Sequence, residues 1–285
     1  MPRLAALALL AAALPVGAQA ACRTETAGGA RLVVCDFHPA ADDLRLFLND
    51  AAGRPYGEFD LVKAALEAKG ETLRFAMNAG MYHKNRTPVG LYVENGAELK
   101  KISTKDGPGN FHLLPNGVFW IDESGAAGVT ETGAFALAFP SPACGSAVTN
   151  EAGSPPGGAP VSGARSSPAP RPLKREKAEG CLRYATQSGP MLVVDGAIHP
   201  KFLPEATSRK RRNGVGVRDD GAVVFAISDS AVTFHEFATF FRDTLKTPNA
   251  LYLDGTISRL YAPDIARDEP GLPMGPIIGV VVKAE

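Results

Sequence analysis

Three short turn sequences constrain the fold of this 285-residue chain more than any other feature. Each lies between two runs that read as β-strands: Asn95-Gly96, Asp195-Gly196 and Asp220-Gly221. A two-residue Asn-Gly or Asp-Gly loop adopts the positive φ angles of the turn whose twist matches two antiparallel strands. The pattern therefore predicts a sheet built largely from β-hairpins, in which the strands that flank each turn pair directly.

Two segments, 57–70 and 233–245, show the helical period instead. Their apolar residues fall on one face: Phe59, Val62 and Leu66 in the first, and Phe234, Phe237, Ala238, Phe241 and Leu245 in the second. Gly70 provides a stop for the first helix. Thr233 and Glu236 have the spacing of a capping box, which predicts where the second helix begins.

Further strands are predicted at 31–37, 44–50, 73–80, 250–254 and 277–283. The predicted elements are thus mostly hairpin-built strands with two packing helices. The chain is therefore predicted to have an α+β fold. We expect a hairpin-rich, mostly antiparallel or mixed sheet, a few packing helices, and a single domain.

The N-terminal residues 1–20 have the pattern of a secretory signal peptide. Arg3 is a minimal positive region, residues 4–17 are apolar, and Ala18, Gln19 and Ala20 form a small-residue cleavage site. The apolar run is too short for a confident membrane span. We expect cleavage after Ala20, a mature chain without a transmembrane span, and a periplasmic or secreted location.

Export places the four cysteines, Cys22, Cys35, Cys144 and Cys181, in an oxidising compartment. Four cysteines allow three pairings, and we predict the sequential one, 22–35 and 144–181, because each then closes a self-contained loop. A metal site is disfavoured, since zinc ligands are usually closer together in sequence.

Residues 140–180 differ in composition from the rest of the chain. They are crowded with Pro, Gly, Ser and Ala, and have almost no large apolar side chain. Such a segment cannot bury enough apolar surface to offset the entropy of ordering it. We interpret it as a surface insertion within one domain spanning 21–285; an interdomain linker is the alternative.

The composition and the absent motifs exclude several classes of protein. Lys and Arg total 30, Asp and Glu total 30, and the formal net charge is zero. The chain has no excess of basic residues, so nothing in its charge indicates a nucleic-acid partner. The chain also lacks the serine-hydrolase elbow, the zinc-protease helix motif, the phosphate-binding loop and the dinucleotide fingerprint.

Three predicted strands end at a polar residue beside a small one: Asn78, Asp229 and Asp254. Strand ends present functional groups to a cleft, although Asp and Asn are also ordinary turn residues. Arg212 precedes another strand and is a candidate anion clamp, because a guanidinium can hold a phosphate through two parallel hydrogen bonds. His112 and His235 are candidates for acid–base work, with surface exposure as the alternative for His235.

Six stretches, read in order, resemble the phosphodiester glycosidase family. They are "FAMNAGMY", "PVGLYV", "NGVFW", "ATQSGPMLVVDG", "RNGVGVRDDG" and "ALYLDGTISRLY". The resemblance covers about 44–261 apart from the Pro-rich segment, and the family includes exported bacterial proteins. The chain departs from the family at Thr256 and Ile257, where relatives carry glycine, and at Asn213, where many carry threonine.

The resemblance implies cleavage of a sugar-1-phosphate diester, and it assigns roles to four residues. Asp254 would act as nucleophile or base, Asp229 as the second carboxylate, Arg212 as the phosphate clamp and Asn78 as a donor to the sugar or an oxyanion. The predicted substrate-binding residues are Gly80, His112, Asn116, Gln187, Ser188, Gly189, Asn213, His235, Gly255, Thr256 and Ser258.

The resulting hypothesis is an exported hydrolase of a carbohydrate or glycosyl-phosphate substrate in an envelope glycan or exopolysaccharide. Retaining and inverting chemistry both stay open, because the separation of two carboxyl groups decides between them. The altered residues after Asp254 favour an alternative, a non-catalytic glycan-binding or envelope-assembly module. No cofactor is required by the sequence, although carboxylates near Asp254 would suit a calcium ion.

Overall fold

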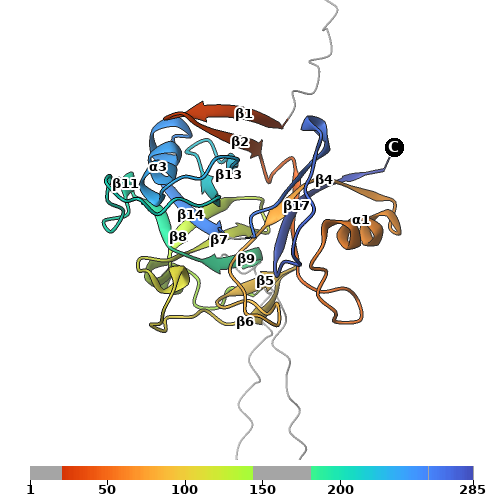
Figure 1. Ribbon diagram of the computed structural model, residues 1–285. Helices are drawn as coiled ribbons and strands as arrows, with labels where there is room; N and C mark the ends of the chain where they lie inside the picture. Colours follow the sequence, from red (N-terminus) through yellow and green to blue (C-terminus); the bar gives the residue numbers. More distant parts are fainter. Residues whose placement is uncertain (1–20, 144–180, 256, 285) are drawn as a thin grey trace, which may run out of the picture.

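The computed structural model describes residues 21–143, 181–255 and 257–284, which form three antiparallel sheets (Figure 1). The predicted signal peptide, most of the Pro-rich segment and Thr256 lie outside the described residues. The α+β prediction is confirmed, since strands dominate and the helices are few and short. Every strand pair within the three sheets is antiparallel, which the hairpin turns led us to expect.

The first sheet has seven strands in the order β1-β2-β13-β12-β14-β10-β11. Their bounds are β1 Cys22–Ala27, β2 Ala30–Phe37, β10 Met191–Val194, β11 Ala197–Ile198, β12 Asn213–Val217, β13 Val223–Ser228 and β14 Asn249–Asp254. Asp195 and Gly196 both have positive φ and connect β10 to β11, and Gly221 has positive φ in the turn from β12 to β13. Both predicted hairpins are therefore confirmed.

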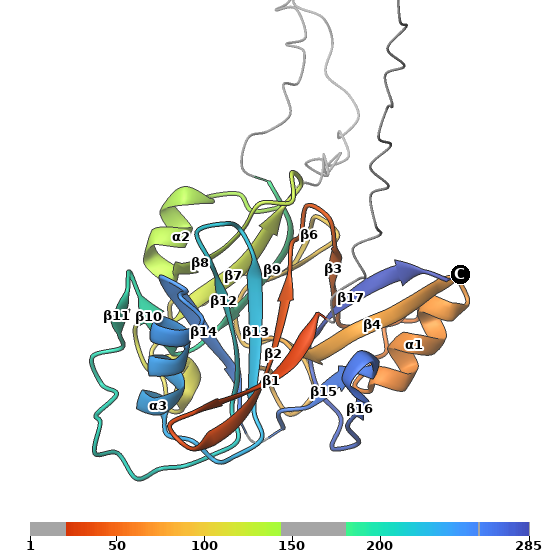
Figure 2. The ribbon, with the colours of Figure 1, turned by 90° about the horizontal axis from the view of Figure 1, so that it is seen from above.

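The second sheet has the order β16-β15-β4-β17-β3, and α1 packs against it (Figure 2). The elements are β3 Asp43–Phe47, α1 Phe59–Glu67, β4 Glu71–Asn78, β15 Leu260–Ala262, the 3₁₀ turn η3 Pro263–Ile265, β16 Arg267–Asp268 and β17 Ile277–Lys283. Phe59, Val62 and Leu66 are the buried residues of α1, as their spacing predicted. Gly70 has a φ of 70° two residues after the helix cap, which is the geometry that glycine tolerates best.

The third sheet has the order β6-β5-β9-β7-β8, with α2 following its last strand. The elements are β5 Tyr92–Glu94, β6 Ala97–Lys100, the 3₁₀ turn η1 Asn110–His112, β7 Gly117–Asp122, β8 Ala127–Glu131, α2 Thr132–Ala138 and β9 Leu182–Ser188. The turn between β5 and β6 uses Asn95 and Gly96 with φ of 50° and 78°, so the third predicted hairpin is also confirmed.

The predicted helix 233–245 begins where expected but changes its winding. The capping box is present: the Thr233 hydroxyl accepts from the Glu236 backbone N–H, and the Glu236 carboxylate accepts from the Thr233 N–H. The α-helix α3 then covers Phe234–Thr239, and the following turn η2, Phe240–Thr244, is a π-helix. Apolar spacing alone could not predict this change, because Phe237 and Phe241 stay buried in either winding.

Four phenylalanines form the centre of the core where the three sheets meet. Phe37 and Phe225 come from the first sheet, Phe75 from the second and Phe119 from the third, and each is about 1% exposed. Ring centroids lie 4.8 Å apart for Phe37 and Phe75, 5.1 Å for Phe75 and Phe225, and 6.2 Å for Phe119 and Phe225. One hydrophobic cluster therefore joins all three sheets.

The predicted Cys22–Cys35 disulfide is present and joins directly opposed residues of β1 and β2. The predicted 144–181 pairing involves Cys144, which lies outside the described residues. We expect the double variant Cys22→Ser, Cys35→Ser to lose about 2–3 kcal/mol of unfolding free energy, because the open chain gains entropy in the unfolded state. Denaturant unfolding followed by Trp120 fluorescence measures this, and an unchanged midpoint would contradict it.

Candidate active site

Asp254 lies at the end of β14, where three segments distant in sequence converge. Its backbone N–H donates to Asn213 Oδ1 (2.7 Å) at the start of β12. Asn78 Nδ2, at the end of β4, donates to Asp254 Oδ2 (3.2 Å), and the Gly255 N–H donates to Oδ1 (2.6 Å). The structure thus brings together Asn78, Asn213 and Asp254 from three different parts of the chain.

Asn78 is fully buried and uses both ends of its amide. Besides Asp254, its Nδ2 donates to the Ile257 carbonyl, and its Oδ1 accepts from the Arg259 N–H (2.8 Å). Its backbone carbonyl accepts from Asn213 Nδ2 (3.2 Å). Asn78 therefore holds the segment after β14 in place as well as the Asp254 carboxylate, which is a positioning role.

Ser258 and Gly255 shape the turn that follows Asp254. The Ser258 hydroxyl donates to the carbonyls of Gly255 (3.0 Å) and Asp254 (3.1 Å). A Cβ atom on Gly255 would lie 2.1 Å from the Tyr252 hydroxyl, so this position requires glycine. Ser258 is thus a structural part of the site, and Gly255 lets the backbone pass beneath a tyrosine.

Burial raises the pKa of the Asp254 carboxyl above its ordinary value. The hydrogen bonds from the Gly255 backbone, Asn78 and the Ile257 backbone oppose this effect but do not outweigh it. Taking a carboxylate out of water without a cationic partner favours its neutral form. Such a perturbed group in a cavity is typical of catalytic carboxylates.

A cavity of about 450 Å³ opens in front of Asp254. Its polar walls come from Tyr82, His83, Asn110, His112, Tyr252 and Asp254, and its apolar walls include Ile257. Among the described residues that line it, Asp254 is the single carboxylate, and no lysine or arginine is present. His112 Nδ1 lies 2.7 Å from the Lys105 carbonyl, a contact that restricts the orientation of the ring.

Arg212 is buried behind Tyr252 and does not line the cavity. Its guanidinium lies 3.6 Å from the ring centroid of Phe234 and 5.7 Å from that of Tyr252. Nε donates to the Val232 carbonyl (3.0 Å) and NH2 to the Ser208 carbonyl (3.2 Å). Burial lowers the pKa of Arg212, partly offset by Tyr252, and its ring contacts replace a carboxylate partner.

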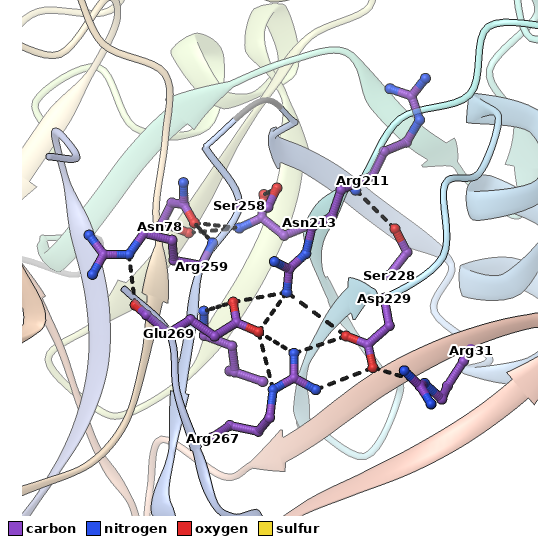
Figure 3. A network of polar contacts seen from close by, with 12 residues as sticks. Arg31, Asn78, Arg211, Asn213, Ser228, Asp229, Ser258, Arg259, Arg267 and Glu269 are labelled. Atoms are coloured by element: carbon purple, nitrogen blue, oxygen red, sulfur yellow. Dashed lines mark hydrogen bonds and ion pairs between the residues drawn. The ribbon is translucent and has the colours of Figure 1, made fainter. Parts of the chain in front are cut away.

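Asp229 belongs to a network of ion pairs outside the cavity (Figure 3). Its oxygens accept from Arg267 (2.9 and 3.2 Å) and Arg31 (3.2 Å), and Arg211 lies 3.9 Å away. Burial alone would raise the pKa of Asp229, but the hydrogen bonds and charge of Arg267, with Arg31 and Arg211, lower it. This carboxylate is saturated by arginines, so we do not assign it the role of second carboxylate.

Glu269 is the other acid of this network and connects it to the site. Its carboxylate accepts from Arg211 (2.7 and 2.9 Å), from Arg267, and from the Leu260 N–H (3.0 Å). Its backbone carbonyl accepts from Arg259 Nε (2.9 Å), the residue whose N–H binds Asn78. The network therefore fixes the segment between β14 and β15 that carries the Asn78 contacts.

Gln187 and Ser188, predicted to bind substrate, instead make hydrogen bonds within the protein. Gln187 is 1% exposed; its Oε1 accepts from the N–H groups of Leu91 (3.0 Å) and Ser103 (2.9 Å), and Nε2 donates to the Ser103 carbonyl and Thr132. Ser188 donates to the Leu253 carbonyl (3.1 Å), next to Asp254 in the chain. Both side chains are used to hold strands and loops together, and neither lines the cavity.

The remaining predicted residues also lie outside the cavity wall. Asn116 is buried and donates to the Phe111 carbonyl (2.8 Å), which supports the loop that carries His112. Gly80 and Gly189 are positions of close approach, where a Cβ would lie 2.3 Å from the Thr186 hydroxyl and 2.6 Å from Asn116 Cβ. His235 lines a different, mainly apolar cavity between β2 and α3.

Sequence reasoning missed two tyrosines in this cavity. Tyr252 precedes Asp254 by two positions on β14, so both side chains leave the same face of the strand, a signal that was readable in advance. Burial and the charge of Asp254 raise the pKa of Tyr252 to about 12 and that of Tyr82 to about 12. Both phenols therefore stay protonated and can donate hydrogen bonds.

Within the described ranges, no group of three or more His, Cys, Asp or Glu residues is arranged to hold a metal ion. No helix in the same part of the chain has the length and apolar character needed to cross a membrane.

The fold thus has three antiparallel sheets and a partly buried carboxylate held by an asparagine. Sequence comparison identifies the family to which the chain belongs. The chain belongs to the phosphodiester glycosidase family, whose model matches residues 71–272. It is 30% identical to the Escherichia coli K12 protein YigE over 224 residues, which covers 79% of this chain and 71% of that protein. YigE itself is described as uncharacterized.

Two solved structures share the fold at low sequence identity. One is the zebrafish N-acetylglucosamine-1-phosphodiester alpha-N-acetylglucosaminidase catalytic domain, auto-inhibited by its pro-peptide, with a TM-score of 0.57 and 11% identity over 93% of this chain and 84% of that one. The other is a Burkholderia pseudomallei K96243 protein described as "Putative exported protein", with a TM-score of 0.50 and 12% identity over 88% and 74%. At this sequence identity, both similarities show that the fold is shared.

Proposed function

We propose that this protein is an exported glycoside hydrolase that cleaves a sugar-1-phosphate diester in an envelope glycan or exopolysaccharide. The observation that carries the proposal is the partly buried Asp254 carboxyl, held by Asn78 in the wall of the 450 Å³ cavity of a phosphodiester glycosidase domain. Export is supported by the signal-peptide pattern of residues 1–20 and by the Cys22–Cys35 disulfide.

The reaction breaks the bond between the anomeric carbon and the phosphate oxygen. The electron pair leaves with the phosphate, and water supplies the hydroxyl group that ends on the sugar. Asp254 either attacks the anomeric carbon or takes the proton of the attacking water. A phosphate monoester leaves as an anion and needs no protonation, which agrees with a cavity whose described lining contains one carboxylate.

The departing phosphate needs donors, and the described cavity wall supplies them without a lysine or arginine. The Tyr252 hydroxyl lies over Gly255 and next to Asp254, and the buried Arg212 lies behind its ring. We assign Tyr252 as the donor to the phosphate, with Arg212 providing positive charge one side chain away. Asn110 and His112 on the facing loop are the other donors.

Tyr252→Phe is expected to lower kcat roughly 10- to 50-fold with a smaller effect on KM, because the lost hydrogen bond is to a group that gains charge in the transition state. Steady-state kinetics on a sugar-1-phosphate diester measures this. Tyr261→Phe, a half-buried tyrosine outside the cavity, is the matched control and should behave as wild type. Equal effects of the two substitutions would remove Tyr252 from the site.

The function itself is tested by incubating the purified mature protein with a UDP-sugar and with a sugar-1-phosphate diester, and measuring released sugar and phosphomonoester. Release of both products in equal amounts supports the proposal. Saccharide binding without any release across a broad panel would show a glycan-binding module instead.

A further inference from the structure

A second cavity, of about 680 Å³, lies between α1, β3, the loop 49–56 and the turn after β5. It is larger than the cavity at Asp254 and falls in the range of about 300–1,000 Å³ typical of small-molecule sites. Leu46, Val62 and Leu66 give it a buried apolar floor. Exposed residues of the loop 49–56 and the turn at Asn95 form its rim.

The charged groups around this second cavity balance each other. The ion pairs are Arg45 with Asp43 (2.5 Å) and Glu71 (2.7 Å), Arg183 with Asp43 (3.2 Å), and Arg54 with Asp50 (2.7 Å). Lys69 and Glu94 add one charge of each sign to the lining. The lining alone carries four cations and two carboxylates, and Asp43 and Glu71, which lie outside the lining, offset the other two positive charges. With these charges paired, the cavity offers many hydrogen-bonding groups, which favours a neutral polyhydroxylated ligand over an ion.

The neutral polar groups of this cavity are also suited to a sugar. Tyr184 donates its hydroxyl hydrogen to Asn95 Oδ1 (2.8 Å), and the Asn95 amide nitrogen has no protein acceptor among the described residues. Tyr56 packs edge-on against Phe47, with centroids 6.3 Å apart, and stays partly exposed in the cavity wall. The face of such a ring attracts the C–H bonds of a sugar ring.

Glu94 is one of the two acids that line this cavity and is partly buried. Its Oε2 accepts from the Tyr92 hydroxyl (2.8 Å). Burial raises the pKa of Glu94, although hydrogen bonds from Tyr92 and the Leu48 backbone partly oppose this. Its carboxyl group is a hydrogen-bond partner for a ligand hydroxyl.

We propose that this cavity is a second, non-catalytic saccharide-binding site. It deepens the proposed function and rests on it for the identity of the ligand, a neutral stretch of the same polymer that carries the cleaved bond. The two cavities border one hydrophobic cluster, against which Tyr56 of the second cavity and Ile257 of the first both pack.

Isothermal titration calorimetry of Asp254→Asn protein with chitohexaose, cellohexaose and maltoheptaose tests the site without turnover. We expect one of these neutral oligosaccharides to bind, and Ala65→Phe, which fills the cavity from α1, to weaken binding at least 10-fold. Asn95→Gly, which keeps the positive φ of the turn and removes the amide, should weaken it in the same direction. Leu61→Phe lies on the exposed side of α1 and is the matched control.

Absence of binding by all three oligosaccharides at millimolar concentration overturns the inference. Binding that survives both Ala65→Phe and Asn95→Gly in folded variants, verified by thermal melting, places the ligand elsewhere and overturns it as well. Hydrolysis of a small sugar-1-phosphate diester by the wild-type protein is measured separately. Failure of that reaction with intact oligosaccharide binding would reject the proposed function and leave this site standing.

Discussion

Asp254→Asn is expected to lower kcat/KM for sugar release by about 10³-fold or more, because the amide can neither attack the anomeric carbon nor accept a proton from water. Asn has nearly the same size, so the turn at Gly255 and Ser258 should persist. Steady-state kinetics on a sugar-1-phosphate diester gives the ratio. Asp220→Asn, the same change at an exposed hairpin turn, is the control and should keep wild-type activity. Undiminished release by Asp254→Asn would mean that the reaction takes place elsewhere.

Glu269→Gln is expected to lower the unfolding free energy at pH 7 by about 1–2 kcal/mol, because Arg211 loses its bidentate carboxylate partner and Arg267 keeps only Asp229. Burial would raise the pKa of Glu269, but the hydrogen bonds and charges of Arg211 and Arg267 lower it below 4.5. Its contribution is therefore present above the unfolded pKa and is lost as the pH falls through the lower folded pKa. The difference between wild type and variant should shrink with acidification.

Urea unfolding of wild type and Glu269→Gln at a series of pH values from neutral to acidic measures this prediction. Glu205→Gln is the matched control, because Glu205 is exposed and makes no ion pair within the described part of the chain. Equal stabilities of wild type and Glu269→Gln at neutral pH would show that Arg211 and Arg267 are satisfied by Asp229 alone. A difference that grows on acidification would contradict the pKa argument.

The local parts of this fold were predictable from the sequence, and the arrangement of its sheets was not. Turn residues such as Asn95-Gly96 determine which neighbouring strands pair as a hairpin, and the spacing of Thr233 and Glu236 determines where α3 begins. The core instead unites Phe37, Phe119 and Phe225 across three sheets. Many pairings of antiparallel strands satisfy the same alternation, so no local pattern could choose among them.

The candidate site was predicted in part. Strand ends and family motifs pointed to Asn78, Asn213 and Asp254, which the structure brings into hydrogen-bonding contact. The surroundings of Arg212 and Asp229 could not be predicted, because no motif names their partners. Arg212 packs against the rings of Phe234 and Tyr252. Asp229 pairs with Arg31 and Arg267. An arginine before a strand looks the same in sequence whether it faces a ligand or two aromatic rings.

The hydrogen bonds of Asn78 have a consequence for when the site forms. They join residues 176 to 181 positions apart in the chain, so loop closure must be complete before the carboxylate of Asp254 is held in place. A partly folded chain therefore has no assembled site around Asp254. If the protein is exported and cleaves a glycan as proposed, its activity begins only when the chain has finished folding, without a separate inhibitor.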